Sequence, residues 1–292
     1  MQDYNCCRIT HLSLLNRLEA GLPELPEVET TRKGIMPHVQ NRRVQEVVIR
    51  QSKLRWPVSP ELREEMTGQC ITSVRRRGKY LLLGTGGGTL LVHLGMSGSL
   101  RILAHNQVAE KHDHIDIILE GDKLLRYTDP RRFGCMLWLR GDIYSHELLR
   151  ALGPEPLGVD FSGIVLFQKS RLRKTPVKCF IMDSHIVVGV GNIYANEALF
   201  LAAINPKIAA GKISRQRYQN LVRCIKDILQ QAIELGGTTL RDFTGSDGKP
   251  GYFKQAQRVY GRGGLACTSC QQNLKEIRLG QRSTVYCTRC QR

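Results

Sequence analysis

Short apolar runs separated by turn residues dominate the first half of the chain, and this pattern predicts β-strands. The runs are β-branched or leucine-rich, and we expect strands at residues 42–50, 80–83, 89–93, 115–119, 124–127 and 136–139. Gly86-Gly87-Gly88 predicts a hairpin between the second and third strands. A helix precedes them and runs toward Gly34, because Pro26 suits a first helical turn and Glu27 and Glu29 are favourable near a positive helix start.

Helical spacing dominates the second half. An apolar stripe predicts a helix that begins near Ser214 and ends at Gly236-Gly237; it consists of Leu221, Ile225, Ile228 and Ile233. Gly153-Pro154-Glu155-Pro156 interrupts the pattern, so we expect a domain boundary near residues 152–163.

The charge balance narrows the choice of partner. The 292 residues include 43 Lys and Arg against 26 Asp and Glu, a net charge of +17. Such a field favours a polyanion such as nucleic acid or an anionic membrane, although a merely basic soluble protein has the same composition. No stretch approaches the ~20 apolar residues that a membrane span needs. Residues 1–22 do not resemble a signal peptide, because Asp3 lies where positive charge is expected. We therefore expect a cytoplasmic protein.

The cysteines predict a metal site rather than disulfides. Four of the ten form a Cys-x2-Cys-x16-Cys-x2-Cys pattern of Cys267, Cys270, Cys287 and Cys290. Paired thiolates at this spacing suit tetrahedral Zn²⁺, and four of them leave no open position, so we expect one structural zinc. Unligated structural cysteines are the alternative interpretation. The other six are scattered and are expected to be reduced thiols.

A possible catalytic amine lies near the start of the chain. Pro23 is followed by Glu24 and Glu27, two spaced carboxylates that could act as its acid partners. An internal proline nitrogen is a tertiary amide without basicity, whereas an N-terminal proline is a secondary amine. Only the second can act as a nucleophile.

Eight motifs follow one another from Pro23 to the C-terminus: PELPEVET, RRRGKYLLL, HLGMSGSLR, KHDH, RYTDPRRFG, VGVGNIYANEALF, SDGKPGYF and the terminal cysteine ribbon. In this order they closely resemble the formamidopyrimidine-DNA glycosylase family. The resemblance implies a bifunctional base-excision repair enzyme, active as a monomer on duplex DNA. Such an enzyme removes oxidised purines, chiefly 8-oxoguanine and formamidopyrimidines, and then cuts the strand by β,δ-elimination at the abasic site.

The resemblance also implies an α+β fold. We expect an N-terminal β-sandwich domain with a helix at residues 23–152, and a helix-two-turn-helix DNA-binding domain at 164–250. A zinc finger with a ribbon-like β-hairpin is expected at 256–292, and residues 1–22 form an extension.

Catalytic roles follow by matched position. The resemblance implies that Pro23 is the Schiff-base nucleophile, Glu24 the proton donor and shuttle at the sugar, and Glu27 an auxiliary acid. Lys79 matches the residue of β-elimination and Arg282 that of δ-elimination, each with a phosphate contact. The alternative for the two glutamates is charge at a helix start, and for Lys79 and Arg282 solvated surface charge.

Three residues match those that fill the void left by an extruded nucleotide. Met96 and Phe133 are apolar wedges, and Arg131 can donate to the orphaned cytosine. A lone Met or Phe is more often part of a core. The related endonuclease VIII branch, which prefers oxidised pyrimidines, normally begins Pro-Glu-Gly-Pro, and Leu25 argues against it.

Phosphate contacts are expected from His112, Arg132, Lys174 and Asn192. Asn192 follows a glycine-spaced turn at the start of an expected helix, where backbone amides can receive a phosphate. His112 and His114 flank Asp113, a pattern that also fits metal ligation.

One departure from the family pattern concerns the nucleophile itself. Family members read Met-Pro-Glu-Leu-Pro, but here Leu22 precedes Pro23. We hypothesise that Leu22 is a UUG initiation codon, read as methionine and removed; proteolysis is a second route to the same end. The rival hypothesis is a catalytically silent, damaged-DNA-binding protein that retains the extension. Lesion preference is expected to depend on a loop at about residues 244–252.

Overall fold

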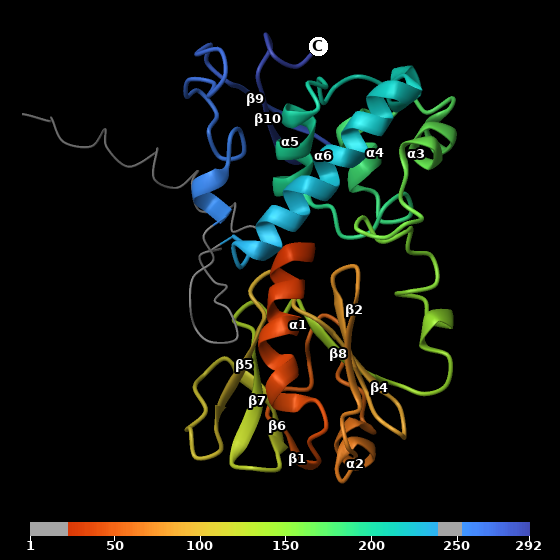
Figure 1. Ribbon diagram of the computed structural model, residues 1–292. Coiled ribbons are helices and arrows are strands. Elements are labelled where there is room, and N and C mark those ends of the chain that lie inside the picture. Colours follow the sequence, from red (N-terminus) through yellow and green to blue (C-terminus); the bar gives the residue numbers. More distant parts are fainter. Residues whose placement is uncertain (1–22, 239–252) are drawn as a thin grey trace, which may run out of the picture.

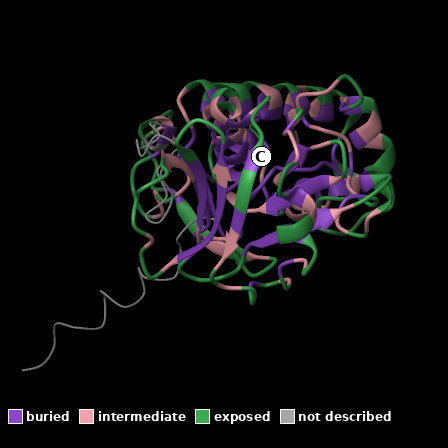
Figure 2. Cartoon of the chain, turned by 90° about the horizontal axis from the view of Figure 1, so that it is seen from below, coloured by how far each residue is buried: buried purple, intermediate pink, exposed green. Residues whose placement is uncertain are grey.

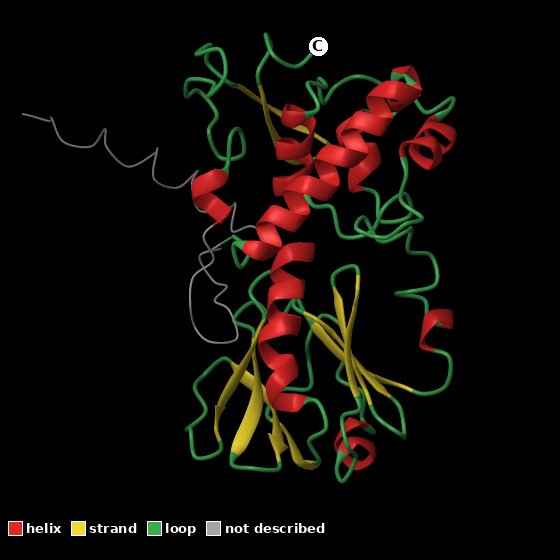
Figure 3. Cartoon of the chain, in the orientation of Figure 1, coloured by secondary structure: helices red, strands yellow, loops and turns green. Residues whose placement is uncertain are grey.

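The computed structural model describes residues 23–238 and 253–292. Residues 1–22, and with them Leu22, lie outside the described part, as does the expected lesion loop at 244–252. Strands fill one half of the molecule and helices the other (Figures 1 and 3). Helix α1 (Leu25–Val39) runs from the junction of the halves along the strands. The fold is therefore α+β, as the sequence predicted.

Two four-stranded antiparallel sheets form the first half. One has the order β1 (Val44–Ile49), β6 (Asp113–Leu119), β7 (Lys123–Thr128), β5 (Ser99–Ala104). The other has the order β2 (Ser73–Arg77), β3 (Tyr80–Gly84), β4 (Thr89–His93), β8 (Cys135–Leu139). The expected hairpin joins β3 and β4, where Thr85 N donates to Gly88 O over 2.8 Å. Helix α2 (Leu62–Met66) packs near β1.

Helix α1 is longer than the sequence suggested. It continues through Gly34 to Val39, because Ile35 and Val39 extend its apolar stripe and are both completely buried. Burial of such a stripe outweighs the cost of roughly 1 kcal/mol for an interior glycine. Val28 lies on the same buried face, nearer the junction between the halves.

The second half contains four helices within the described residues. They are α3 (Gly163–Ser170), α4 (Val177–Met182), α5 (Asn192–Leu201) and α6 (Arg215–Glu234). Ser214 caps α6, since its hydroxyl accepts a hydrogen bond from Arg217 N at 3.3 Å. The predicted stripe of α6 is buried. Residues 152–162, which connect the halves, contain no helix or strand.

A β-hairpin of β9 (Lys275–Leu279) and β10 (Arg282–Tyr286) lies near the C-terminus. Short 3-10 turns occupy Ile143–Ser145, Ala210–Lys212 and Phe253–Ala256. Buried residues concentrate on the strands and on the inner faces of the helices (Figure 2). Among the described residues no helix has both the length and the apolar character needed to cross a membrane.

A buried ion network joins β6 to β7. Arg126 is 2 % exposed, and its guanidinium donates to both oxygens of Asp116 at 2.8 Å and to Asp113 Oδ2 at 3.3 Å. Burial alone would raise the pKa of Asp116, but the hydrogen bonds from Arg126 and Arg50 hold that pKa below its usual value. Arg126 contacts both aspartates and so links them in one network.

Replacing Arg126 with Met should therefore lower the free energy of unfolding by about 3 kcal/mol, because both buried carboxylates lose their shared partner. Among the described residues, Asp116 then keeps only Arg50 at 2.6 Å, and the nearest cation to Asp113 is Arg101 at 3.5 Å. Urea denaturation measures the loss. Arg63→Met is the control, since Arg63 forms an exposed pair with Glu46 and should change stability by less than about 1 kcal/mol. Equal losses for the two variants would contradict a special role for the buried network.

Candidate functional site

The first residues of α1 pack against the loop that precedes α5. Leu25 N donates to Gly189 O at 3.3 Å, and Ile193 N donates to Glu24 Oε1 at 2.9 Å. Gly191 makes this approach possible, because a Cβ at that position would overlap the Glu24 carboxyl group. Glu24 therefore lies at the N-terminal end of α5, where backbone amides favour negative charge. Two segments about 170 residues apart in the sequence meet here.

The carboxyl group of Glu24 has a strongly raised pKa. It is 3 % exposed, and burial raises its pKa from 4.5 to about 7, with the nearby Lys79 opposing the rise and Glu27 adding to it. Its second oxygen, Oε2, has no hydrogen-bond partner among the residues that the structure describes. A carboxyl group with a pKa near neutrality can both donate and accept a proton at physiological pH. Glu24 is thus equipped for proton transfer.

Glu27 is completely buried and fully hydrogen-bonded. Its Oε2 accepts from Glu24 N at 2.9 Å, while Oε1 accepts from the Tyr194 hydroxyl at 2.7 Å and from Thr238 N at 2.8 Å. The carboxylate thus ties the start of α1 to α5 and to the residue just before the undescribed segment. This arrangement fixes the backbone that carries Pro23 and Glu24. Pro23 itself is buried.

Lys79 lies in the turn between β2 and β3 and is half-buried. Its ammonium lowers the pKa values of both Glu24 and His93, so it faces both groups. Glu155, in the segment that connects the halves, holds the turn by accepting from Gly78 N at 2.6 Å and from Arg77 at 3.0 Å. The connecting segment thereby positions the lysine.

A cavity of about 390 Å³ opens between the sandwich and the C-terminal hairpin. It is lined by Arg55, His93, Gly95, Met96, Phe133 and Arg282. Gly95 has φ +64°, and a Cβ there would overlap the backbone of Phe133, so the loop that carries Met96 packs directly on the turn that carries Phe133. Arg131 lies beside them, with its guanidinium carbon 5.0 Å from the centre of the Phe133 ring.

The sequence interpretation missed two residues of this cavity, Arg55 and His93. Burial, Lys79 and Arg55 lower the pKa of His93 to about 4, so its ring is neutral at physiological pH. Its Nδ1 accepts from Gly95 N at 3.0 Å. The position of His93 at a strand end, two residues before Gly95, could have indicated it. Arg55 reaches the cavity from a loop whose backbone donates to Gly134 O at 3.2 Å, and no local pattern indicated that contact.

The four expected phosphate contacts differ in exposure. His112 and Asn192 are half-buried, whereas Arg132 and Lys174 are exposed. None of the four lines the cavity. A metal site at His112 and His114 is not supported, since His114 Nε2 is hydrogen-bonded to Asp129 O at 2.8 Å.

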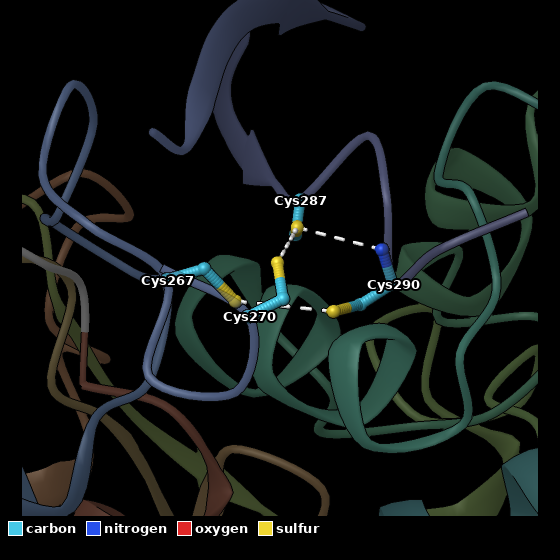
Figure 4. A group of neighbouring side chains, drawn as sticks. All are labelled: Cys267, Cys270, Cys287 and Cys290. Carbon is cyan, nitrogen blue, oxygen red and sulfur yellow. Dashed lines mark hydrogen bonds between the residues drawn. The ribbon is translucent and has the colours of Figure 1, made fainter. Parts of the chain in front are cut away.

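The four cysteines of the C-terminal pattern gather in one cluster (Figure 4). Their sulfur atoms lie within 4.8 Å of one another, with Cys270 and Cys287 3.4 Å apart and Cys267 and Cys290 4.0 Å apart. Tetrahedral Zn–S bonds of about 2.3 Å place sulfur atoms roughly 3.8 Å apart. The cluster therefore fits a zinc site. It is the only such group of His, Cys, Asp and Glu side chains within residues 23–238 and 253–292.

The β9–β10 hairpin next to this cluster is hydrogen-bonded to helices α4 and α5. Lys178 of α4 is completely buried and donates to Ser283 O at 2.6 Å and to the Thr284 hydroxyl at 2.7 Å. Asn196 of α5 accepts from Val285 N at 2.9 Å. These contacts fix β10, whose first residue, Arg282, reaches the cavity.

Comparisons with known proteins cover nearly the whole chain. The family model for the formamidopyrimidine-DNA glycosylase N-terminal domain matches residues 22–136, and that for the H2TH domain of the same family matches residues 152–244. The formamidopyrimidine-DNA glycosylase of Hahella chejuensis is 58% identical over 271 residues, which are 93% of this chain and 100% of the relative. That of Pseudomonas aeruginosa strain LESB58 is 59% identical over 271 residues, with the same coverage.

Solved structures give the same result. The structure of the Lactococcus lactis FPG (MutM) protein in complex with Fapy-dG-containing DNA is similar with a TM-score of 0.84 and 31% identity; the match covers 92% of this chain and 100% of that one. The MutM (FPG) protein of Thermus thermophilus has a TM-score of 0.83 and 37% identity, with 92% and 98% covered. The resemblance seen in the sequence motifs is thereby confirmed at the level of the family.

The raised pKa of Glu24 predicts a pH-dependent effect of Glu24→Gln on stability. An acid whose pKa rises on folding stabilises the fold fully below its unfolded value near 4.5, and this contribution is lost as pH rises through about 7. Gln does not titrate, so the variant should gain stability relative to the parent between pH 5 and pH 8, by on the order of 3 kcal/mol.

Thermal unfolding of both proteins across this pH range measures the gain. Glu64→Gln, at an exposed position of α2, controls for the loss of one charge. A difference between Glu24→Gln and the parent that stays constant with pH would contradict the raised pKa.

Proposed function

The chain belongs to the formamidopyrimidine-DNA glycosylase family, and from that premise we propose how its own residues excise oxidised purines from duplex DNA and cut the strand. The protein is a bifunctional DNA glycosylase and abasic-site lyase. The proposal depends on the environment of Glu24. This carboxyl group has a pKa of about 7, is next to Pro23 in the sequence and faces Lys79. DNA with oxidised purines or abasic sites is its substrate, so we expect it to act in the cytoplasm, on the nucleoid.

The reaction begins when the damaged nucleotide leaves the base stack, because its sugar cannot be reached inside the duplex. The lone pair of the free Pro23 amine then attacks C1′, and the base departs with the bonding electrons and takes up a proton. The proline nitrogen then gives up its proton and forms a C=N double bond while the C1′–O4′ bond breaks and O4′ takes up a proton, which opens the sugar ring. The product is an iminium ion, positively charged because its nitrogen has four bonds to carbon and no proton to lose. That charge acidifies the C2′ proton.

Glu24 is the group we assign to proton transfer at the sugar. Its pKa lies where a single carboxyl group can give a proton in one step and take it back in the next. Its unpartnered Oε2 supports this role, because that oxygen is not occupied by another donor among the described residues. Glu27, with three donors on its oxygens, is assigned to holding Glu24 and Pro23 in place.

Strand cleavage follows from the iminium. Loss of the C2′ proton expels the 3′ phosphate in β-elimination, and a second elimination expels the 5′ phosphate. We assign Lys79 to the first step, supported by its position facing Glu24. Arg282 is assigned to the second, supported by its place in the lining of the cavity. Both cations also favour phosphate binding.

The residues at the cavity are suited to occupy the space that an extruded nucleotide leaves in the duplex. Met96 and Phe133 offer apolar surface, and Arg131 can donate to the base left without a partner. We propose that His112, Arg132, Lys174 and Asn192 contact phosphates outside the cavity. The net charge of +17 supports the same partner.

A single structural zinc is proposed for the cysteine cluster. Cys267, Cys270, Cys287 and Cys290 would hold it with no open position, so it supplies rigidity and no catalytic step. Its place next to β9 and β10 supports a role in holding Arg282 toward the DNA. We keep residues 256–292 as the zinc finger, 164–250 as the helix-two-turn-helix domain and 23–152 as the catalytic domain.

The active form is proposed to begin at Pro23. Only a free proline amine has the lone pair that the first step needs, and residues 1–22 have to be absent for this. Initiation at Leu22 followed by removal of that residue gives the required end, as does proteolysis.

Borohydride trapping tests the nucleophile. The form that begins at Pro23 should give a covalent adduct with an 8-oxoguanine:cytosine duplex, and mass analysis should locate the adduct on Pro23. The form with residues 1–22 should give none, since its proline nitrogen is an amide. Glu24→Gln in the shorter form should bind the duplex normally but excise at least ~10²-fold more slowly.

An adduct of the shorter form at a residue other than Pro23 would disprove the assignment of Pro23. Tight binding without an adduct in either form would favour the silent, damaged-DNA-binding protein.

Zinc content tests the cluster. In Cys287→Ala the metal bound should fall from one ion per chain toward zero, and affinity for an abasic-site duplex should fall more than about tenfold as the Arg282 contact is lost. Metal analysis and a binding titration measure both. Cys224→Ala is the matched control, because Cys224 is a buried cysteine of α6 outside the cluster. Unchanged metal content in Cys287→Ala would refute the proposed site.

A further inference from the structure

One buried carboxylate joins the two loops that carry the proposed void-filling residues. Asp129 follows β7 and is completely buried. Its Oδ1 accepts from the Ser97 hydroxyl at 2.6 Å, and its Oδ2 accepts from Gly134 N at 2.9 Å and from the Tyr127 hydroxyl at 3.0 Å. Ser97 directly follows Met96, and Gly134 directly follows Phe133. The carboxylate therefore contacts both loops at the residue beside each wedge.

The third void-filling residue is tied into the same group. Arg131 N donates to the Ser97 hydroxyl at 3.1 Å, and that hydroxyl donates onward to Asp129. The Ser97 oxygen thus accepts one hydrogen bond and donates another, and it is 1 % exposed. A chain of this kind strengthens each of its bonds in a site that excludes water.

The backbone of Asp129 is also held from both sides. Asp129 N donates to His112 O at 3.0 Å, and Asp129 O accepts from His114 Nε2 at 2.8 Å and from Arg132 N at 3.1 Å. Phe133, by contrast, is 43 % exposed. The base of the turn is rigid, and its tip projects from the surface.

We propose that Asp129 and Ser97 form a clamp that keeps the Met96 loop and the Arg131–Phe133 turn in one fixed arrangement, so that they enter the duplex as a single unit. Both are positioning residues, and the clamp rests on the proposed function. Side chains that are already ordered lose less conformational entropy when they replace an extruded nucleotide. The clamp also aims Arg131 at the orphaned base, and so it sets the preference for the base opposite the lesion.

The structure offers a control that separates this role from general stability. The Tyr127 hydroxyl donates to the same carboxylate, but no hydrogen bond joins it to Ser97 or to Arg131 among the described residues. Tyr127→Phe removes one bond to Asp129 and leaves the chain from Arg131 through Ser97 intact. Ser97→Ala breaks that chain and leaves the Tyr127 bond intact.

The test compares these two variants with the parent, all beginning at Pro23, under single-turnover conditions. The substrates are 8-oxoguanine opposite cytosine, 8-oxoguanine opposite adenine, and an abasic site in single-stranded DNA. Cleavage of the single-stranded abasic site requires Pro23 and Lys79, but this substrate has no partner strand and hence no void to fill.

Ser97→Ala should excise 8-oxoguanine opposite cytosine roughly tenfold more slowly, because a buried hydrogen-bond chain is lost. Its preference for cytosine over adenine should narrow, and its cleavage of the single strand should be unchanged. Tyr127→Phe should match the parent on all three substrates.

The results for these variants distinguish failure of the clamp from failure of the proposed function. Parental excision rates and parental base preference in Ser97→Ala would overturn the clamp, as would an equal loss on the single strand. Failure of the parent itself to cleave the single-stranded abasic site would instead contradict the proposed function. If Ser97→Ala does not fold, Ser97→Cys replaces it, because a thiol is a weaker donor of similar size. An intermediate loss confined to the duplex substrates supports the clamp, and parental rates with Ser97→Cys overturn it.

Discussion

The contact between the start of α1 and the start of α5 is the constraint on which the site depends. Glu24 can approach the α5 amides only because Gly191 has no side chain, and Glu27 closes the same junction through Tyr194 and Thr238. The two halves of the molecule therefore meet at Glu24, the carboxyl group that we propose for proton transfer. Burial at that junction raises the pKa of Glu24, so the packing of the two halves also sets the acidity of this carboxyl group.

Two positive groups of the site, Lys79 near this junction and Arg282 in the cavity, are held by different parts of the chain. Lys79 is positioned by Glu155 of the connecting segment, and Arg282 by the buried Lys178 beneath β10. His93 is neutral because burial and two neighbouring cations disfavour its charged form. The site is thus assembled from both halves of the molecule.

Much of the fold could be predicted from the sequence, and the exceptions have physical reasons. The interior strands β3, β4, β6 and β7 have clear apolar runs because both of their neighbours are strands. Of the four edge strands, β1 and β8 were predicted and β2 and β5 were missed. Edges tolerate charge, and Arg75, Arg76 and Arg77 mask the apolar pattern of β2. Helix α1 passes Gly34 because tertiary burial outweighs local propensity. In the site, motifs indicated Glu24, Lys79 and the cysteines, but the Arg55 contact joins distant loops and has no local signature. The roles of Pro23 and of the DNA-contacting residues remain predictions.

The cysteine cluster bears on the resistance of the protein to oxidation. Thiolates are the protein groups that oxidants attack most readily, and the same oxidants convert guanine into the lesions removed by this family. The four sulfur atoms lie together in a small cluster with Cys267 and Cys287 fully buried. Coordination to a closed-shell ion and burial both shield such sulfur atoms from oxidation. The proposed zinc and the burial of Cys267 and Cys287 would therefore protect the part of the protein that holds Arg282 from the agents that damage guanine.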